Sequence, residues 1–240
     1  MVTRPVLLSA PHRLLFLTGA AQFAAMLLWW SLWLLELAGI GPAVPQPVPG
    51  NLLHAPMLLF LMLPAFFFGF LLTVFPRWIG YEDAGPRAYL PVAAGFSLAA
   101  LALWAGILVE DAGIVAAAFA PAALGWLRAL GTMAGLLLRE RREGKPPTWH
   151  SWSILAAMTI GLPCLILAAF GLYRVDPLMV HVANLVMLDL CVLPVFVTVC
   201  HRMVPFFAGN VVAGYQRWRP YWLLGAFWAA SLVATAGFAT

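Results

Sequence analysis

Charged residues are scarce in this chain. Only 9% of its 240 residues are Asp, Glu, Lys or Arg, and 64% are hydrophobic, whereas a water-soluble domain carries roughly 25% charged residues. This composition excludes a soluble cytosolic enzyme. The formal net charge of +4 does not indicate nucleic-acid binding, because the basic residues lie in short segments beside long apolar runs, where they orient a membrane protein. We therefore predict an integral membrane protein.

Cysteines are few and lack the spacing of a redox or haem motif. The three, Cys164, Cys191 and Cys200, all lie in apolar stretches, and none belongs to a C-x-x-C or C-x-x-C-H sequence. The spacing therefore suggests neither a disulfide framework nor a covalently attached c-type haem. We interpret the cysteines as small core residues.

Apolar runs long enough to cross a bilayer, which takes about 20 helical residues, account for most of the chain. They do not alternate apolar and polar residues as β-barrel strands do, and the first is too long for the core of a signal peptide. The predicted fold class is an all-α polytopic transmembrane helical bundle, one domain over residues 1–240. The seven runs are 14–40, 52–76, 88–109, 113–138, 151–173, 178–200 and 221–240.

Prolines interrupt several of the predicted helices, and the last predicted helix reaches the end of the sequence. Prolines inside four of them predict kinks: Pro64, Pro121, Pro163 and Pro194. The seventh run reaches Thr240 without a charged flank or polar tail. We therefore expect the chain to be the front part of a longer bundle, truncated at its C-terminus.

Lysine and arginine are distributed unequally about the predicted spans. Eleven fall on one side, and near the other side there is only Arg174. Because loops rich in Lys and Arg stay in the cytoplasm, the N-terminus is predicted to be cytoplasmic. The Pro-rich loop 41–50 and the acidic turn Glu110–Asp111 are then predicted to face the opposite side. The eleven are Arg4, Arg13, Arg77, Arg87, Arg139, Arg141, Arg142, Lys145, Arg202, Arg217 and Arg219.

Three ionisable residues lie inside the spans, where each is costly unless it is paired or faces a cavity. Glu36 is near the outer end of the first helix, and Arg128 and Asp189 are near the middles of the fourth and sixth. At 1.5 Å per residue, Arg128 and Asp189 are each about 15 Å from the inner ends of their helices. This shared depth predicts a buried ion pair between them. A proton or ion path is the alternative.

Histidines are candidates for binding haem iron or another metal, because a neutral imidazole ligates without adding charge to the membrane. His54 opens the second run and His181 the sixth, so both belong to the outer layer. We predict that they are axial ligands or near neighbours of one haem, with Glu36 orienting one imidazole through its free N–H. His150 and His201 fall in the cytoplasmic layer, where ordinary interfacial histidines are expected.

Two segments resemble sequence motifs of a known family. Residues 69–80, Gly-Phe-Leu-Leu-Thr-Val-Phe-Pro-Arg-Trp-Ile-Gly, resemble the G-F-L-L-T-A-x-P-N-W-T-G signature of NnrS-family membrane proteins. Residues 201–207, His-Arg-Met-Val-Pro-Phe-Phe, are similar to that family's G-R-x-I-P-F-F motif. The two occur in the family's order, each at the cytoplasmic end of a predicted helix. On these residues the chain resembles the NnrS family.

The resemblance implies a multi-pass protein of the bacterial inner membrane, with about twelve helices, a non-covalent b-type haem and copper. It also implies a role in the response to nitric oxide and nitrosative stress, with nitric oxide as a ligand. His54 matches the first histidine of the family's H-x-H-E-M stretch, which here reads His-Ala-Pro-Met and lacks the second histidine and the glutamate. Arg202 matches the second motif, which implies a contact with a haem propionate or a phosphate, or a topology anchor.

Two other classes of function remain open from the sequence. A transporter or channel-like permease would use Arg128 and Asp189 to line a path for a small solute or metal ion. A purely structural membrane subunit would carry neither pigment nor substrate. The resemblance leaves open whether the protein catalyses a reaction.

Overall fold

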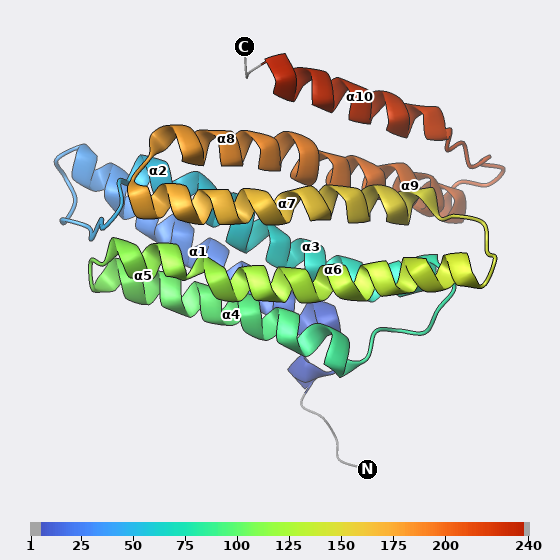
Figure 1. The fold of residues 1–240 in the computed structure, drawn as a ribbon, viewed down its shortest axis with the longest axis horizontal. Coiled ribbons are helices and arrows are strands. Elements are labelled where there is room, and N and C mark those ends of the chain that lie inside the picture. Colours follow the sequence, from blue (N-terminus) through green and yellow to red (C-terminus); the bar gives the residue numbers. More distant parts are fainter. Residues whose placement is uncertain (1–5, 238–240) are drawn as a thin grey trace.

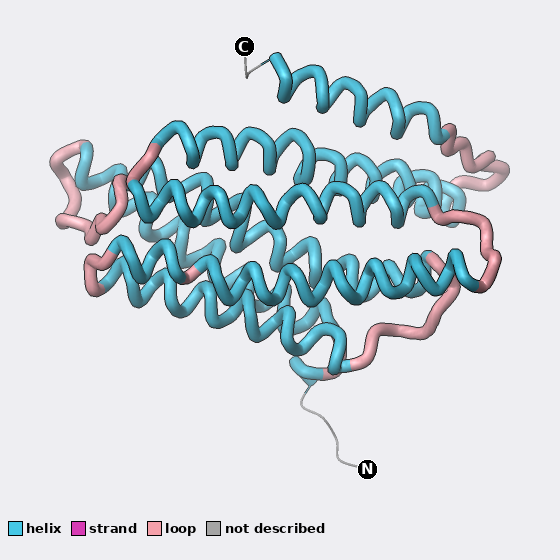
Figure 2. The backbone as a smooth tube through the Cα atoms, in the orientation of Figure 1, coloured by secondary structure: helices cyan, strands magenta, loops and turns pink. Residues whose placement is uncertain are grey.

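The computed structural model describes residues 6–237, and every regular element within that range is helical (Figures 1 and 2). This confirms the predicted all-α class. The elements are the 3₁₀ turn η1 (Val6–Leu8), the α-helices α1 (Pro11–Leu37), α2 (Gly50–Pro56), α3 (Leu63–Trp78), α4 (Pro86–Leu108), α5 (Ala112–Ala117), α6 (Phe119–Arg142), α7 (Trp149–Arg174), α8 (Pro177–Met187), α9 (Leu193–Val211) and α10 (Tyr221–Gly237), and the π-helical segments η2 (Met57–Met62) and η3 (Leu188–Val192).

Six helical stretches of the described chain are long and apolar enough to cross a membrane. They are α1, the continuous stretch Gly50–Trp78, α4, Ala112–Arg142, α7 and Pro177–Val211. The shorter apolar helix α10, of 17 residues, corresponds to the seventh predicted run, whose last three residues lie outside the described range. The chain is therefore a multi-pass helical membrane protein.

The helices associate by close backbone approach. The contact between α4 and α6 is the clearest case: a Cβ added at Gly95 would lie 2.5 Å from the carbonyl oxygen of Pro121 and 3.0 Å from the Cα of Gly125. In a bilayer, where lipid is as apolar as the helix surface, small residues at such crossings supply the packing that holds helices together. The backbone of α6 thus leaves no room for a side chain at Gly95.

A π-helical segment precedes two of the four prolines at which kinks are predicted, Pro64 and Pro194. The N–H of Leu63 bonds to the carbonyl of Leu58, and the N–H of Leu193 bonds to that of Leu188, each five residues back instead of four. A proline follows in both cases, and because proline has no N–H it cannot continue the α-helical ladder. Pro121 and Pro163 lie in helices that continue without such a segment.

Most of the basic helix ends predicted to share one side lie toward one end of the bundle, which we call the inner end after the predicted orientation, although α4 begins short of it, beside the middle of α6 (Figure 1). Tyr81 donates to Glu143 at the inner end at 2.9 Å, and Tyr89, near the start of α4, donates its hydroxyl to the carbonyl of Leu8 at 2.7 Å. Arg174 terminates α7 at the opposite, outer end (Figure 1). Of the eleven basic residues, Arg4 alone lies outside the described residues. Which end faces the cytoplasm stays a prediction.

Candidate functional site

His54 lies in the last turn of α2, at the outer end. Its imidazole stacks on the indole of Trp30 from α1, with ring centroids 3.9 Å apart and planes inclined by 27°. The Nδ1 atom is buried and has no hydrogen-bond partner. Buried side-chain nitrogens are nearly always bonded, so an unpartnered one calls for an explanation. A ligand absent from the structure would provide it.

His181 lies in α8, and α8 packs against α2, the helix that carries His54. The His181 side chain is exposed on the bundle surface. Three residues further along α8, Asn184 has a buried side-chain oxygen without a hydrogen-bond partner. The structure therefore brings the two helices together at the outer end, but the ring contact of His54 is with Trp30. Joint ligation by His54 and His181 stays a prediction.

The role predicted for Glu36 is wrong in this structure. Its carboxylate accepts a 2.9 Å hydrogen bond from the backbone N–H of Val44 and a 3.4 Å bond from the side chain of Gln46, instead of bonding the His54 ring. The chain reverses after α1 at Gly39, whose φ is +73°, a left-handed conformation that glycine adopts without strain. The returning loop thus supplies donors to Glu36, a fold-back that helical spacing cannot reveal.

The predicted ion pair between Arg128 and Asp189 is also wrong. Arg128 is exposed and donates to the carbonyl of Arg87 at 3.0 Å, while Asp189 accepts a 3.4 Å bond from Thr235 of α10. The described residues form three other ion pairs: Arg77–Asp83, Arg139–Glu143 and Lys145–Glu143.

The ion pair was predicted by measuring the depth of Arg128 and Asp189 in the membrane from the inner ends of their own helices, as if those ends were level. Because α4 begins beside the middle of α6, Arg128 is level with the first turn of α4. From there α6 extends about 20 Å further at 1.5 Å per residue. A guanidinium at this level can bond a free carbonyl at the start of α4 and needs no buried carboxylate.

The inner end brings together the two segments with family-like sequences. Trp78 ends α3, and the guanidinium carbon of Arg202 in α9 lies 4.8 Å from the centroid of its ring. An Arg202 nitrogen also donates a long, 3.5 Å hydrogen bond to the carbonyl of Trp78. A planar guanidinium stacks favourably on an aromatic face. Two motifs more than 120 residues apart in the chain thus form one junction.

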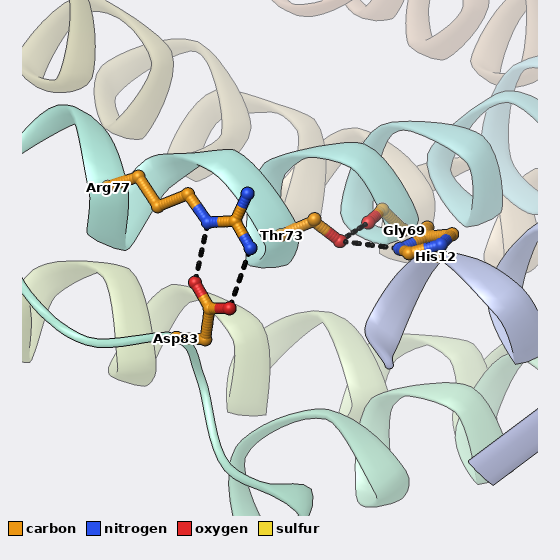
Figure 3. A network of polar contacts seen from close by, with 5 residues as sticks. All are labelled: His12, Gly69, Thr73, Arg77 and Asp83. Atoms are coloured by element: carbon orange, nitrogen blue, oxygen red, sulfur yellow. Dashed lines mark hydrogen bonds and ion pairs between the residues drawn. The ribbon is translucent and has the colours of Figure 1, made fainter. Parts of the chain in front are cut away.

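Residues 69–80 also fix α3 to its neighbours (Figure 3). Thr73 donates its hydroxyl to the carbonyl of Gly69 at 2.8 Å and accepts from His12 of α1 at 3.3 Å. Arg77 binds both carboxylate oxygens of Asp83, at 2.6 and 2.7 Å, and this contact holds the pKa of the Asp83 carboxyl below its usual range. The segment therefore anchors α1, α3 and the following loop together.

Comparison with known proteins gives one positive finding. The model of the family described as "NnrS protein" matches residues 6–240. The chain belongs to the NnrS family. No curated protein and no solved structure matches it significantly, so the assignment rests on the family model.

A pair of histidines that was not predicted as a site lies at the inner end of this NnrS protein. His150, in the first turn of α7, and His201 of α9 have ring nitrogens 2.9 Å apart. The second nitrogen of His201 is 3.2 Å from the carbonyl of Pro220. Because a carbonyl only accepts, neutral His201 must donate to Pro220 and accept from His150. The remaining nitrogen of His150 is then a buried lone pair without a hydrogen-bond partner.

The sequence contained part of the signal for this pair. Both histidines fall in the predicted cytoplasmic layer, but the adjacency of α7 and α9 comes only from tertiary packing. His201 also occupies the position of the glycine in the motif G-R-x-I-P-F-F, so the resemblance does not identify it as a ligand. The structure instead gives it His150 on one side and Pro220 on the other.

Proposed function

We propose that this NnrS-family membrane protein binds haem at its outer end through His54 and acts in the response to nitric oxide and nitrosative stress. It would do so as a multi-pass protein of the bacterial inner membrane with a cytoplasmic N-terminus. The observation that carries the proposal is the buried, unpartnered Nδ1 of His54. His54 would hold the haem iron through its imidazole, and the iron would supply a site that can bind nitric oxide.

The residues around His54 fit such a group in part. Trp30 fixes the plane of the imidazole by stacking, and a ligating imidazole needs that orientation. His181, on the helix packed against α2, is proposed as the second ligand or a near neighbour. Glu36 is engaged by its own loop and is not part of the proposed site.

Arg202 does not belong to this haem site. It follows His181 by 21 residues along α8, η3 and α9, a separation of about 30 Å at 1.5 Å per residue. Arg202 therefore cannot contact the propionates of a haem held at the outer end. Its stacking on Trp78 indicates a separate role at the inner end.

The experiment is the visible spectrum of protein purified from a host that makes haem. We expect a Soret band in the parent and its loss or a spin-state shift in His54→Ala and in His181→Ala. His12→Ala is the matched control, because His12 bonds Thr73 at the inner end and should keep the parent spectrum. Unchanged spectra in both outer variants, or a colourless parent, would contradict the proposal.

Copper, the second cofactor that the family suggests, is proposed at the His150–His201 pair. Imidazole nitrogen is a good copper ligand, and His150 keeps an unpartnered nitrogen. No group of three or more His, Cys, Asp or Glu among residues 6–237 could hold a metal, and both nitrogens of His201 are engaged, so the Nδ1 of His150 would be the one ligand that this pair offers. Elemental analysis should show copper in the parent and loss of copper, with the haem band retained, in His150→Ala. Equal copper in both proteins would refute this assignment.

The permease alternative loses the observation that motivated it. It has Arg128 and Asp189 line a path through the bundle, whereas Arg128 is exposed and donates to the carbonyl of Arg87. A purely structural subunit would explain neither the free nitrogen of His54 nor that of His150. The haem proposal uses the first of these nitrogens and the copper proposal the second.

A further inference from the structure

A cavity of about 430 Å³ lies at the inner end, between the end of α3, the second half of α9 and the segment 212–220. Half of its lining residues are arginines, and the rest are apolar. The lining consists of Arg77, Arg202, Arg217, Arg219, Val74, Trp78, Met203 and Phe206. Both family motifs contribute to it, so the Trp78–Arg202 junction is one wall of this space.

The positive charge of the cavity is largely uncompensated. Arg77 is neutralised by Asp83, but the other three arginines take part in none of the ion pairs of residues 6–237. Arg202 bonds the carbonyl of Trp78, and Arg217 bonds the neutral side chain of Asn210 at 3.4 Å. Like charges around a partly enclosed space repel one another and attract an anion.

Two of these guanidinium groups are held in place by aromatic rings. Arg202 stacks on Trp78, and the guanidinium carbon of Arg217 lies 5.5 Å from the ring centroid of Phe206. Stacking uses the flat face of a guanidinium and leaves its N–H edges free to donate. Gly209 allows this arrangement, because a Cβ there would come within 2.8 Å of the Arg217 Nε. The arginines are therefore arranged before any ligand arrives.

We propose that this cavity binds a phosphate group presented from the inner face of the membrane. Guanidinium groups bind phosphate oxygens in paired, charge-assisted hydrogen bonds, and three of them offer more donors than a carboxylate can accept. Basic pockets between transmembrane helices on the cytoplasmic side are typical sites for phosphate-bearing lipid headgroups. The same chemistry would accept free phosphate. The site lies at the opposite end from the proposed haem and does not depend on it.

The test measures binding to the purified full chain in neutral detergent. The two probes are inorganic phosphate and short-chain phosphatidylglycerol, with short-chain phosphatidylcholine as the zwitterionic comparison. We expect phosphatidylglycerol or phosphate to bind and to raise the Tm. Competition between them assigns the source: phosphate that binds and displaces the lipid indicates a free anion, and lipid binding without phosphate binding indicates a headgroup.

Two variants change the cavity in different ways. Arg202→Gln removes a charge-assisted contact and should weaken binding about tenfold or more. Gly209→Ala keeps every charge of the cavity but displaces the Arg217 side chain, so it should also weaken binding. This second variant provides the test if Arg202→Gln folds poorly. The matched controls are Arg142→Gln, at the inner end but outside the cavity, and Gly225→Ala, where a Cβ meets open space.

The outcomes distinguish a specific phosphate site in the cavity from a general attraction of anions to the positively charged inner end. Weaker binding in Arg202→Gln and Gly209→Ala, with parent affinity in both controls, supports the proposal. An equal loss in Arg142→Gln would show that only the overall positive charge of the inner end matters and would overturn it. Failure of the parent to bind either phosphatidylglycerol or phosphate would overturn it as well.

Discussion

The two ends of the bundle use their polar residues differently. At the inner end, side chains bond across elements that are distant in the chain, as in the pairs His12–Thr73, Tyr81–Glu143 and His150–His201. At the outer end the carboxylates satisfy backbone groups of their own loops: Asp111 and Asp176 cap α5 and α8, and Glu36 binds Val44. His54 is left with a buried nitrogen that nothing satisfies.

This difference follows from where the charges lie. Arginines concentrated at one side for orientation also meet one another and nearby aromatic rings when the helices assemble, as at Trp78 and Arg202. At the outer end the short acidic turns cap helices, which is a local use of carboxylates. The stacking of His54 on Trp30 joins α2 to α1 there.

The largest expected effect is on topology itself. A reporter active only in the cytoplasm, fused after Arg142, should be active, and the same reporter fused after Pro45 should be silent, because the basic loops are retained in the cytoplasm. The measurement is reporter activity normalised to protein level. A reversed pattern would exchange the two ends and move the proposed phosphate site to the other face of the membrane.

The next effect concerns the outer end. Glu36→Gln weakens the bond to the Val44 N–H, and hydrogen bonds to charged groups contribute about 1.5–3 kcal/mol. We expect a lower free energy of unfolding and faster proteolysis within the loop after α1. Glu110→Gln, at an exposed turn of the same end, should match the parent in both measurements.

The Soret band of Glu36→Gln tests whether Glu36 also acts on the His54 imidazole. If Glu36 only holds the loop, Glu36→Gln should keep the parent spectrum. A shifted Soret band would show that Glu36 acts on the imidazole after all and would contradict the assignment made from Val44 and Gln46.

A smaller loss is expected from His201→Ala at the inner end. The substitution removes the bond to His150 and the bond to Pro220, each contributing about 1 kcal/mol. The free energy of unfolding should fall in His201→Ala, whereas Arg142→Gln, at an exposed inner-end site, should change it little. Equal stabilities of these two variants would show that the histidine pair contributes nothing to the fold.

The sequence predicted the spans well because a bilayer sets a minimum apolar length, which is a local property. It placed His54 and His181 at one end for the same reason. The sequence did not predict contacts that depend on how far one helix is shifted along another or on how a loop folds back onto a helix. Arg128 is level with Arg87 only because α4 starts beside the middle of α6. Glu36 meets Val44 only because the chain reverses after Gly39. The His150–His201 pair needs α7 and α9 to be neighbours, which no spacing encodes.

The smallest effect expected is a pH dependence at the inner end. Glu143 accepts hydrogen bonds from Lys145, Arg139 and Tyr81, and these contacts lower the pKa of its carboxyl from 4.5 to about 2. A carboxyl whose folded pKa is lowered stabilises the fold above its unfolded pKa, and this contribution is lost as the pH falls through the folded value. The gain is small because the group is at the surface and screened by solvent.

Fluorescence of a probe attached in the loop 79–85, which Tyr81 ties to Glu143, can follow this contact. The parent signal should hold from pH 6 to about pH 4 and decline from there towards pH 2. In Glu143→Gln, which has no carboxyl to protonate, the signal should start at a more mobile level and lack this step. Glu82→Gln, in the same loop, is the matched control and should follow the parent. A parent midpoint near the ordinary value of 4.5 would mean that Lys145 and Arg139 do not hold the carboxylate in solution.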